Sequence, residues 1–287
     1  MALGRGSSTG LSRRPRRLSD QQTARRMLDA AVAEVNRDGL TVSLDHISFE
    51  DVIREADVSR SSAYRRWPHK DLFLSDLIKE LARNAAPPLA VDELTLIRQI
   101  LAEHIDWLEQ TDLRQRLMMD LIRQLALLDF QTVYASPGWR TYLALHATFL
   151  SLADGRLRDE VQRILAASER DRMSRVAQSW QRLATLFGYQ LRPGADSFSS
   201  LVTLLSATMR GLVIMALSMP EIAEQRSSKS PFDAGAATEW SLVATGFASL
   251  ASAFLEPDPA IEWSDERLAV VRAELAAISL PPRADRD

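Results

Sequence analysis

Apolar residues recur at helical spacing along nearly the whole chain. In its first half, the clearest stripes are Ala24, Leu28, Ala31 and Val35, and later Leu72, Phe73, Leu77, Ile78 and Leu81. The full pattern predicts a helix that starts at about residue 48 and helices over about 19–38, 59–67, 70–84, 91–109, 112–133, 138–152, 156–187, 196–219, 235–256 and 264–278. No strand or hairpin pattern competes with them, so the sequence predicts an all-α fold.

Polar residues mark where these helices begin and where the chain divides. Ser19 with Gln22 and Ser48 with Asp51 have the spacing of capping boxes, in which a side chain satisfies a free backbone N–H. The pair Pro87-Pro88 ends the helix over 70–84 and predicts a domain boundary. We therefore expect a disordered arm over 1–18, a small three-helix domain over 19–86 and a larger helical domain over 87–287.

Residues 48–70 predict two short helices joined by a tight turn at Asp57, which is typical of a helix-turn-helix that reads DNA. Ser48 and Ser59 are the expected helix caps, and Ala63 and Trp67 point to the core. The second helix is polar, small and basic on its outer side. Side chains expected to reach base edges are Arg60, Ser61 and Ser62, and those expected to contact the DNA backbone are Tyr64, Arg65, Arg66 and Lys70.

The segment from about 20 to 84 resembles the DNA-binding domain of the TetR family of bacterial transcriptional regulators. The resemblance lies in Ala30, Gly39, Val52-Ile53, Ala56, Val58-Ser59, Tyr64, Trp67 and Lys70. Asp57 stands where the family usually has glycine, and Leu40 to Ile47 is longer than the family norm. The resemblance implies a larger helical domain that binds a small molecule and forms a homodimer, and a repressor that its ligand releases from a palindromic DNA operator. It also implies that the segment over 91–109 transmits the ligand signal.

Charge supports a nucleic-acid role for the first part of the chain. The net charge is −3, but residues 1–85 hold 15 Lys+Arg against 12 Asp+Glu, and the remainder holds 20 against 26. Five arginines and no acid lie within residues 1–17: Arg5, Arg13, Arg14, Arg16 and Arg17. Such an arm is expected to lie along phosphates or to enter a minor groove, and the alternative is a solubilising terminus.

Several classes of chemistry are unsupported by the sequence. There are no cysteines, which excludes disulfides, thiolate catalysis and cysteine-ligated metals. Nucleotide-binding, hydrolase and zinc-protease motifs are missing, and His104 with Asp106 lacks the spacing to share a helix face. We therefore expect no enzyme activity, metal or cofactor. The sequence contains no apolar run near ~18 residues and no secretory signal, so we expect a cytoplasmic protein without a membrane partner.

Aromatic and thioether side chains concentrate between residues 100 and 190, where they serve either as core or as the lining of the implied cavity. The ligand-binding candidates are His104, Trp107, Met118, Arg123, Tyr142, His146 and Trp180. Segments 198–219 and 237–255 are apolar nearly all round, which fits either pairing with a second subunit or burial within one subunit. A DNA-binding architectural protein without a ligand and, less favoured, a helical enzyme remain the alternative functions.

Overall fold

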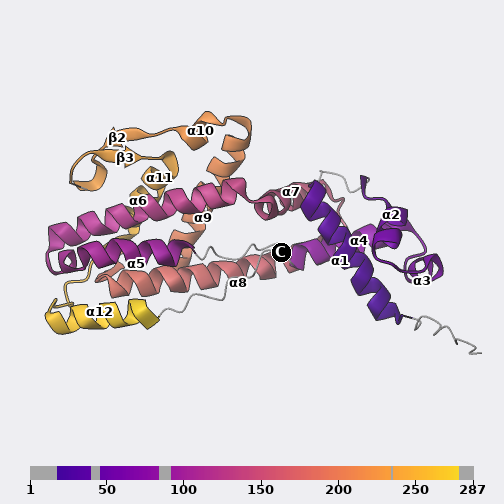
Figure 1. Cartoon of the computed structure of the whole chain (residues 1–287), viewed down its shortest axis with the longest axis horizontal. Coiled ribbons are helices and arrows are strands. Elements are labelled where there is room, and N and C mark those ends of the chain that lie inside the picture. Colours follow the sequence, from indigo (N-terminus) through magenta and orange to yellow (C-terminus); the bar gives the residue numbers. More distant parts are fainter. Residues whose placement is uncertain (1–17, 40–45, 84–91, 234, 278–287) are drawn as a thin grey trace, which may run out of the picture.

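A computed structural model describes residues 18–39, 46–83, 92–233 and 235–277, and its main architecture is all-α, as predicted (Figure 1). The α-helices are α1 (Asp20–Asp38), α2 (Phe49–Glu55), α3 (Arg60–Arg66), α4 (Lys70–Arg83), α5 (Asp92–His104), α6 (Thr111–Ala135), α7 (Pro137–Ser151), α8 (Arg156–Leu186), α9 (Phe198–Ser218), α10 (Glu221–Glu224), α11 (Leu242–Phe254) and α12 (Asp265–Ala277). Two short 3₁₀ segments cover Ile105–Glu109 and Pro231–Asp233.

Two short antiparallel pairs correct the expectation that no strand would form. β1 (Tyr189–Leu191) pairs with β4 (Leu255–Pro257), and β2 (Ser227–Lys229) pairs with β3 (Thr238–Trp240). Each strand has three residues, which is too short to show an alternating pattern in the sequence. The helix expected from residue 235 begins later than predicted, because residues 238–240 form β3. α11 begins after Ser241, whose Oγ accepts from the Ala244 N–H at 3.2 Å.

The helix expected over 91–109 is also shorter than predicted. α5 ends at His104, and the chain tightens into the 3₁₀ segment Ile105–Glu109. His104 stacks on Trp107 with ring centroids 4.3 Å apart, a contact that the tighter turn brings within reach.

The four N-terminal helices form a small unit whose local signals act as the sequence indicates. Ser19 and Gln22 form a reciprocal capping box on α1, and Ser48 Oγ accepts from the Asp51 N–H at 3.3 Å. Asp57 has φ 51°, the left-handed conformation that glycine adopts most easily. The turn therefore adopts the left-handed conformation with Asp57 at this position, since aspartate tolerates this region better than most residues.

Helix α8 is the structural link between the small unit and the rest of the molecule (Figure 1). It runs without a break for 31 residues, packs on α4 at its beginning and continues along the larger bundle. α7 packs on both α1 and α4. Leu145 and Val161, from α7 and α8, therefore share one apolar cluster with the core of the small unit. The boundary predicted at Pro87-Pro88 lies outside the described residues.

Helices α9 and α11 are the most apolar elements, and they pack on each other and on α6. A Cβ at Gly246 would lie 3.0 Å from Thr208 Cγ2, so the small residue permits the close approach of α11 to α9. By length and composition α9 could cross a membrane, contrary to the sequence expectation that no segment would reach that length. Core helices of soluble proteins pass the same test, and Leu201, Val202 and Leu205 of α9 are buried against the bundle.

Candidate nucleic-acid interface and ligand cavity

Helix α3 stands on a rigid aromatic support. Ala63 and Trp67 are fully or almost fully buried, as the sequence predicted. The Trp67 ring packs edge-on against Phe73 with centroids 5.1 Å apart, and Phe49 of α2 lies 5.1 Å from Phe73. Because α2, α3 and α4 each contribute one ring, the orientation of α3 is determined by packing rather than by surface contacts.

The outer face of α3 begins with Arg60 and Tyr64, which both contact Glu50 of α2. Arg60 Nε lies 2.9 Å from Glu50 Oε2, and the Tyr64 hydroxyl donates to Glu50 Oε1 at 2.8 Å. The hydrogen bond to Glu50 raises the pKa of Tyr64 above its ordinary value. One carboxylate therefore fixes the two side chains, although 76% of the Arg60 side chain remains exposed.

The other two arginines of α3 are paired as well. Arg65 forms an ion pair with Asp20 of α1, and Arg66 Nη2 lies 3.2 Å from Asp76 of α4. Both arginine side chains are more than 40% exposed. Exposed pairs of this kind contribute only about 0–1 kcal/mol each, so phosphate oxygens could replace the carboxylates at little cost.

The serines near α3 have different environments. Ser59 caps α3 by accepting from the Ser62 N–H at 3.2 Å, and Ser61 is exposed. Ser62 is 7% exposed, and its Oγ accepts from Ser59 Oγ at 2.8 Å. This burial leaves little of the Ser62 side chain exposed for a base edge. Ser48 caps α2, so its hydroxyl is engaged at a helix end.

The remaining five predicted DNA contacts differ in how far the structure describes them. Lys70 begins α4 and is half-buried. The arginines of the arm, Arg13, Arg14, Arg16 and Arg17, lie outside the described residues.

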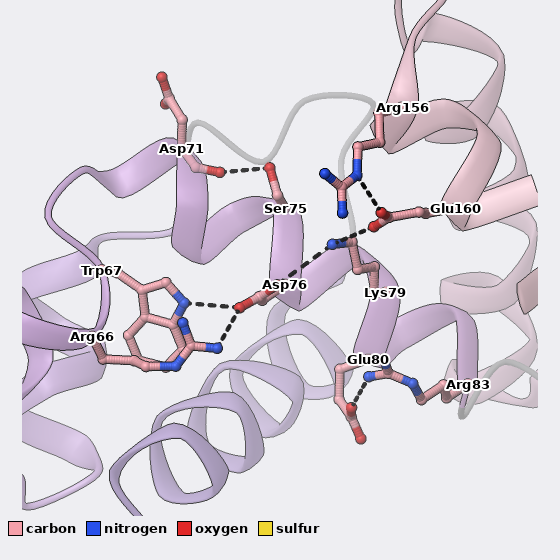
Figure 2. A network of polar contacts seen from close by, with 10 residues as sticks. All are labelled: Arg66, Trp67, Asp71, Ser75, Asp76, Lys79, Glu80, Arg83, Arg156 and Glu160. Carbon is pink, nitrogen blue, oxygen red and sulfur yellow. Dashed lines mark hydrogen bonds and ion pairs between the residues drawn. The ribbon is translucent and has the colours of Figure 1, made fainter. Parts of the chain in front are cut away.

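A chain of polar contacts joins the end of α3 to α8 (Figure 2). Asp76 Oδ2 accepts from Trp67 Nε1 at 3.0 Å and from Arg66, while its other oxygen lies 3.6 Å from Lys79 Nζ. Lys79 Nζ lies 2.7 Å from Glu160 Oε2 of α8. Figure 2 marks this ion pair with a dashed line. Hydrogen bonds from Lys79 and Arg156 lower the pKa of Glu160 to about 2, so the link stays charged over the physiological pH range.

The larger helical region encloses a cavity of about 340 Å³, within the size range of small-molecule sites. Its walls come from α5 to α9 and α11 together with Phe187 and Leu255. Apolar side chains in the lining include Ile97, Met118, Leu121, Ile122, Leu125, Val133, Trp139, Trp180, Leu183, Val202, Leu205, Met209 and Phe247. The polar side chains are Asp129, Thr132, Arg172, Ser179, Ser206 and Arg210.

Charged groups concentrate around Glu169 of α8. Its carboxylate accepts from Arg210 Nη2 at 2.7 Å, from Arg172 Nη2 at 3.4 Å and from the Tyr142 hydroxyl. Burial alone would raise the pKa of Glu169, but the hydrogen bonds from Arg210 and Tyr142 hold it below its ordinary value. Burial and the contact with Glu169 raise the pKa of Tyr142, so the phenol remains protonated and serves as a donor.

Asp129 of α6 has the opposite environment. Burial raises its pKa to about 6, and the charge of Arg172 offsets only part of this effect. The two carboxyl groups therefore differ in their surroundings, since Glu169 has three hydrogen-bond donors and Asp129 is desolvated without such compensation.

Two of the seven predicted ligand-binding residues, Met118 and Trp180, line the cavity. The other five lie outside this lining. His104 stacks on Trp107, and Arg123 pairs with Asp120 at 2.6 Å. Tyr142 donates to Glu169, and His146 Nδ1 lies 2.9 Å from the Tyr142 carbonyl oxygen.

Sequence reasoning missed Asp129, Arg172 and Arg210. Arg210 carried a usable signal, because it is the only charged residue in the 21-residue helix α9. Asp129 carried a weaker signal, because it is an acidic residue among neighbouring apolar residues of α6. Arg172 lies in a charged stretch of α8 and could not be distinguished from solvent-facing arginines.

No family model and no curated protein matches the chain. A solved structure described as a complex of SmeT with triclosan is similar to it at 20% sequence identity and a TM-score of 0.40, covering 84% of this chain and 96% of that chain. A likeness at this level is too low to assign the chain to a family.

Proposed function

We propose that the chain is a DNA-binding transcription regulator of the TetR type, in which α3 reads DNA and the cavity accepts a small ligand. The observation that carries the proposal is the outer face of α3, where three exposed arginines lie on a helix held by a buried aromatic support. A short exposed helix with basic side chains and a fixed orientation is what entry into a major groove requires.

The environments of the side chains suggest separate roles. Arg60 is the most exposed arginine of α3 and lies in its first turn beside Ser61, so these two are the proposed base readers. Tyr64, Arg65, Arg66 and Lys70 are the proposed contacts to the DNA backbone. Arg13, Arg14, Arg16 and Arg17 of the arm are proposed to add phosphate contacts.

A second copy of the chain is the proposed partner of α9. This helix exposes the large apolar side chains Leu204, Ile214, Met215 and Leu217, with the small exposed residues Ala207 and Gly211 between them. An apolar row interrupted by small residues suits close helix pairing, and dimer symmetry implies a palindromic operator. Sedimentation at micromolar concentration should show a dimer, and a monomer would exclude this part of the proposal.

The proposed signal path runs through α8. One side of this helix contributes Arg172 and Trp180 to the cavity, and its first turns hold Lys79 of α4 through Glu160. A ligand that favours one position of α8 would therefore favour one position of α4 and α3 (Figure 2). This replaces the expectation that the segment over 91–109 transmits the signal, since the main contacts of α5 are with α6 and the following 3₁₀ segment.

A gel shift with genomic fragments, including the promoter next to the chain's own gene, tests the function. Replacement of Arg60 by Ala should relax the preference at one base position by about 1–3 kcal/mol, whereas Lys70→Ala should weaken binding to all sequences alike. Arg175→Ala, which removes an exposed arginine from α8, is the matched control. A wild-type protein that shifts no fragment specifically contradicts regulation, and a shift that no ligand alters favours the architectural alternative.

A further inference from the structure

Asp129 is an acidic residue of the cavity lining whose carboxyl group accepts no hydrogen bond from the described residues. Among the described residues, no side chain or backbone N–H donates a hydrogen bond to its carboxyl group, and no cation lies within ion-pair distance. The cavity's own hydroxyls are already engaged, since Thr132 donates to the Leu128 carbonyl and Ser179 to the Arg175 carbonyl. A desolvated acceptor without a donor is costly unless something else supplies the donor.

The charges near Asp129 balance without a ligand. Arg172 and Arg210 carry two positive charges, and Glu169 and Asp129 carry two negative charges when both are ionised. Tyr142, which also contacts Glu169, remains neutral. A ligand with a net charge would therefore leave an uncompensated charge in a largely apolar cavity, where that charge is poorly solvated.

Arg172 contributes positive charge near Asp129 without a hydrogen bond to its carboxyl group. It is 7% exposed, lines the same cavity as Asp129, and its Nε–H has no hydrogen-bond partner among the described residues. A guanidinium only donates and a carboxylate only accepts. A hydroxyl can donate, so a ligand hydroxyl can supply the donor that the Asp129 carboxyl group lacks.

We propose that the cavity binds an uncharged, flat apolar molecule bearing a hydroxyl that donates to Asp129. The inference rests on the ligand-binding part of the proposed function. The rings of Trp139, Trp180 and Phe187 and the aliphatic lining would surround the apolar body, and about 340 Å³ accommodates a two-ring aromatic molecule.

The test compares four probes on one scaffold by titration calorimetry of the full chain without DNA. The probes are naphthol, methylnaphthalene, naphthoate and protonated naphthylmethylamine. We expect naphthol to bind about 10-fold or more tightly than each of the others, because one charge-assisted hydrogen bond is worth at least that factor. Tighter binding of naphthoate or of the amine overturns the proposal.

Variants of Asp129 assign the effect to this side chain. In Asp129→Ala the preference for naphthol over methylnaphthalene should fall to about parity while the affinity for methylnaphthalene is retained, and Asp129→Asn should keep part of the preference because its amide retains an acceptor. Asp112→Asn, an exposed acid of the same helix, is the control. An unchanged preference in Asp129→Ala refutes the role of Asp129.

The outcomes also separate this inference from the proposed function. If methylnaphthalene binds as tightly as naphthol, the cavity is a ligand site but the hydroxyl assignment is wrong. If none of the four probes binds, the hydroxyl assignment and the ligand cavity are both contradicted, whereas the DNA-binding role is still judged by the gel shift.

Discussion

Arginine–carboxylate contacts occur in two contrasting environments in this molecule. On α3 the three arginines are at least 42% exposed, and each pairs with an acid of α1, α2 or α4. In the cavity, Arg172 and Arg210 share Glu169 and have side chains that are 9% and 24% exposed. Exposed pairs exchange partners at little cost, whereas a buried pair cannot lose one partner without leaving a desolvated charge. The same chemistry therefore suits reversible contact with phosphate on α3 and a fixed framework around the cavity.

The largest effect is expected when Glu169 is replaced by Gln. Arg172 and Arg210 would lose the carboxylate that compensates both, and we expect the free energy of unfolding to fall by about 3 kcal/mol. Urea unfolding measures this loss. Asp171→Asn, which removes the partner of the exposed Arg175 on the same helix, should change stability by less than about 0.5 kcal/mol. Equal effects of the two variants would remove the distinction between buried and exposed pairs.

Replacement of Asp129 by Asn should have the opposite sign. Its pKa is about 6 in the folded chain against an ordinary value of 3.8, so ionisation of this group lowers stability progressively from about pH 3.8 and fully above about pH 6. Two pKa units correspond to about 3 kcal/mol, and because water reaches part of the side chain we expect a gain of about 2 kcal/mol at pH 8.

The gain from Asp129→Asn should disappear below about pH 3.8, where the carboxyl group is protonated in both the folded and the unfolded state. Unfolding free energies measured in urea across this pH range test the sign. A variant that is less stable than the wild type at pH 8 would show that Asp129 has a stabilising partner.

These two carboxyl groups also show what the sequence could and could not predict. The caps at Ser19, Ser48 and Ser59 and the turn at Asp57 were predictable, because each depends on residues within four positions of one another. The environment of Asp129 depends on side chains from several helices far apart in the sequence. Helical periodicity gives the face on which a residue lies but not which helix covers it, so the cavity lining could not be derived.

Local patterns also failed where tertiary contacts determine local structure. Ser62 has the small polar side chain of a base reader, yet its hydroxyl accepts from Ser59 inside the domain. The paired strands at Tyr189 and Leu255 join segments 66 residues apart, and neither segment is long enough to be recognised alone. For the strands, the deciding partner lies outside the pattern that was read, whereas for Ser62 the deciding feature is its burial in the domain.

The Lys79–Glu160 pair is about as exposed as the Arg210–Glu169 pair of the cavity, since both of its side chains are 21% exposed, but it joins α4 to α8. We expect Lys79→Met and Glu160→Gln each to lower Tm by about 2 °C, and the double variant to lose less than the sum of the two, because both single changes break one contact. Thermal unfolding followed by circular dichroism tests this. Arg83→Met, which removes the exposed partner of Glu80 on the same helix, is the control. Strictly additive losses would show that the pair does not couple α4 to α8.

The smallest effect is expected for Glu50→Gln. Glu50 can influence DNA binding in two ways, through its negative charge and through its ion pair with Arg60. The change removes a negative charge beside the DNA-reading face and weakens the contact that orients Arg60. We therefore expect binding to random duplex DNA to strengthen about 3-fold and its salt slope to steepen by up to about one unit, while the preference for the specific site decreases. Fluorescence anisotropy at several salt concentrations measures the affinity for random DNA, its salt slope and the preference for the specific site.

Glu55→Gln, which removes the partner of Arg37 at the end of α2, is the control and should leave the sequence preference unchanged. If Glu50→Gln strengthens specific and random binding by the same factor, Glu50 modulates only charge and does not position Arg60.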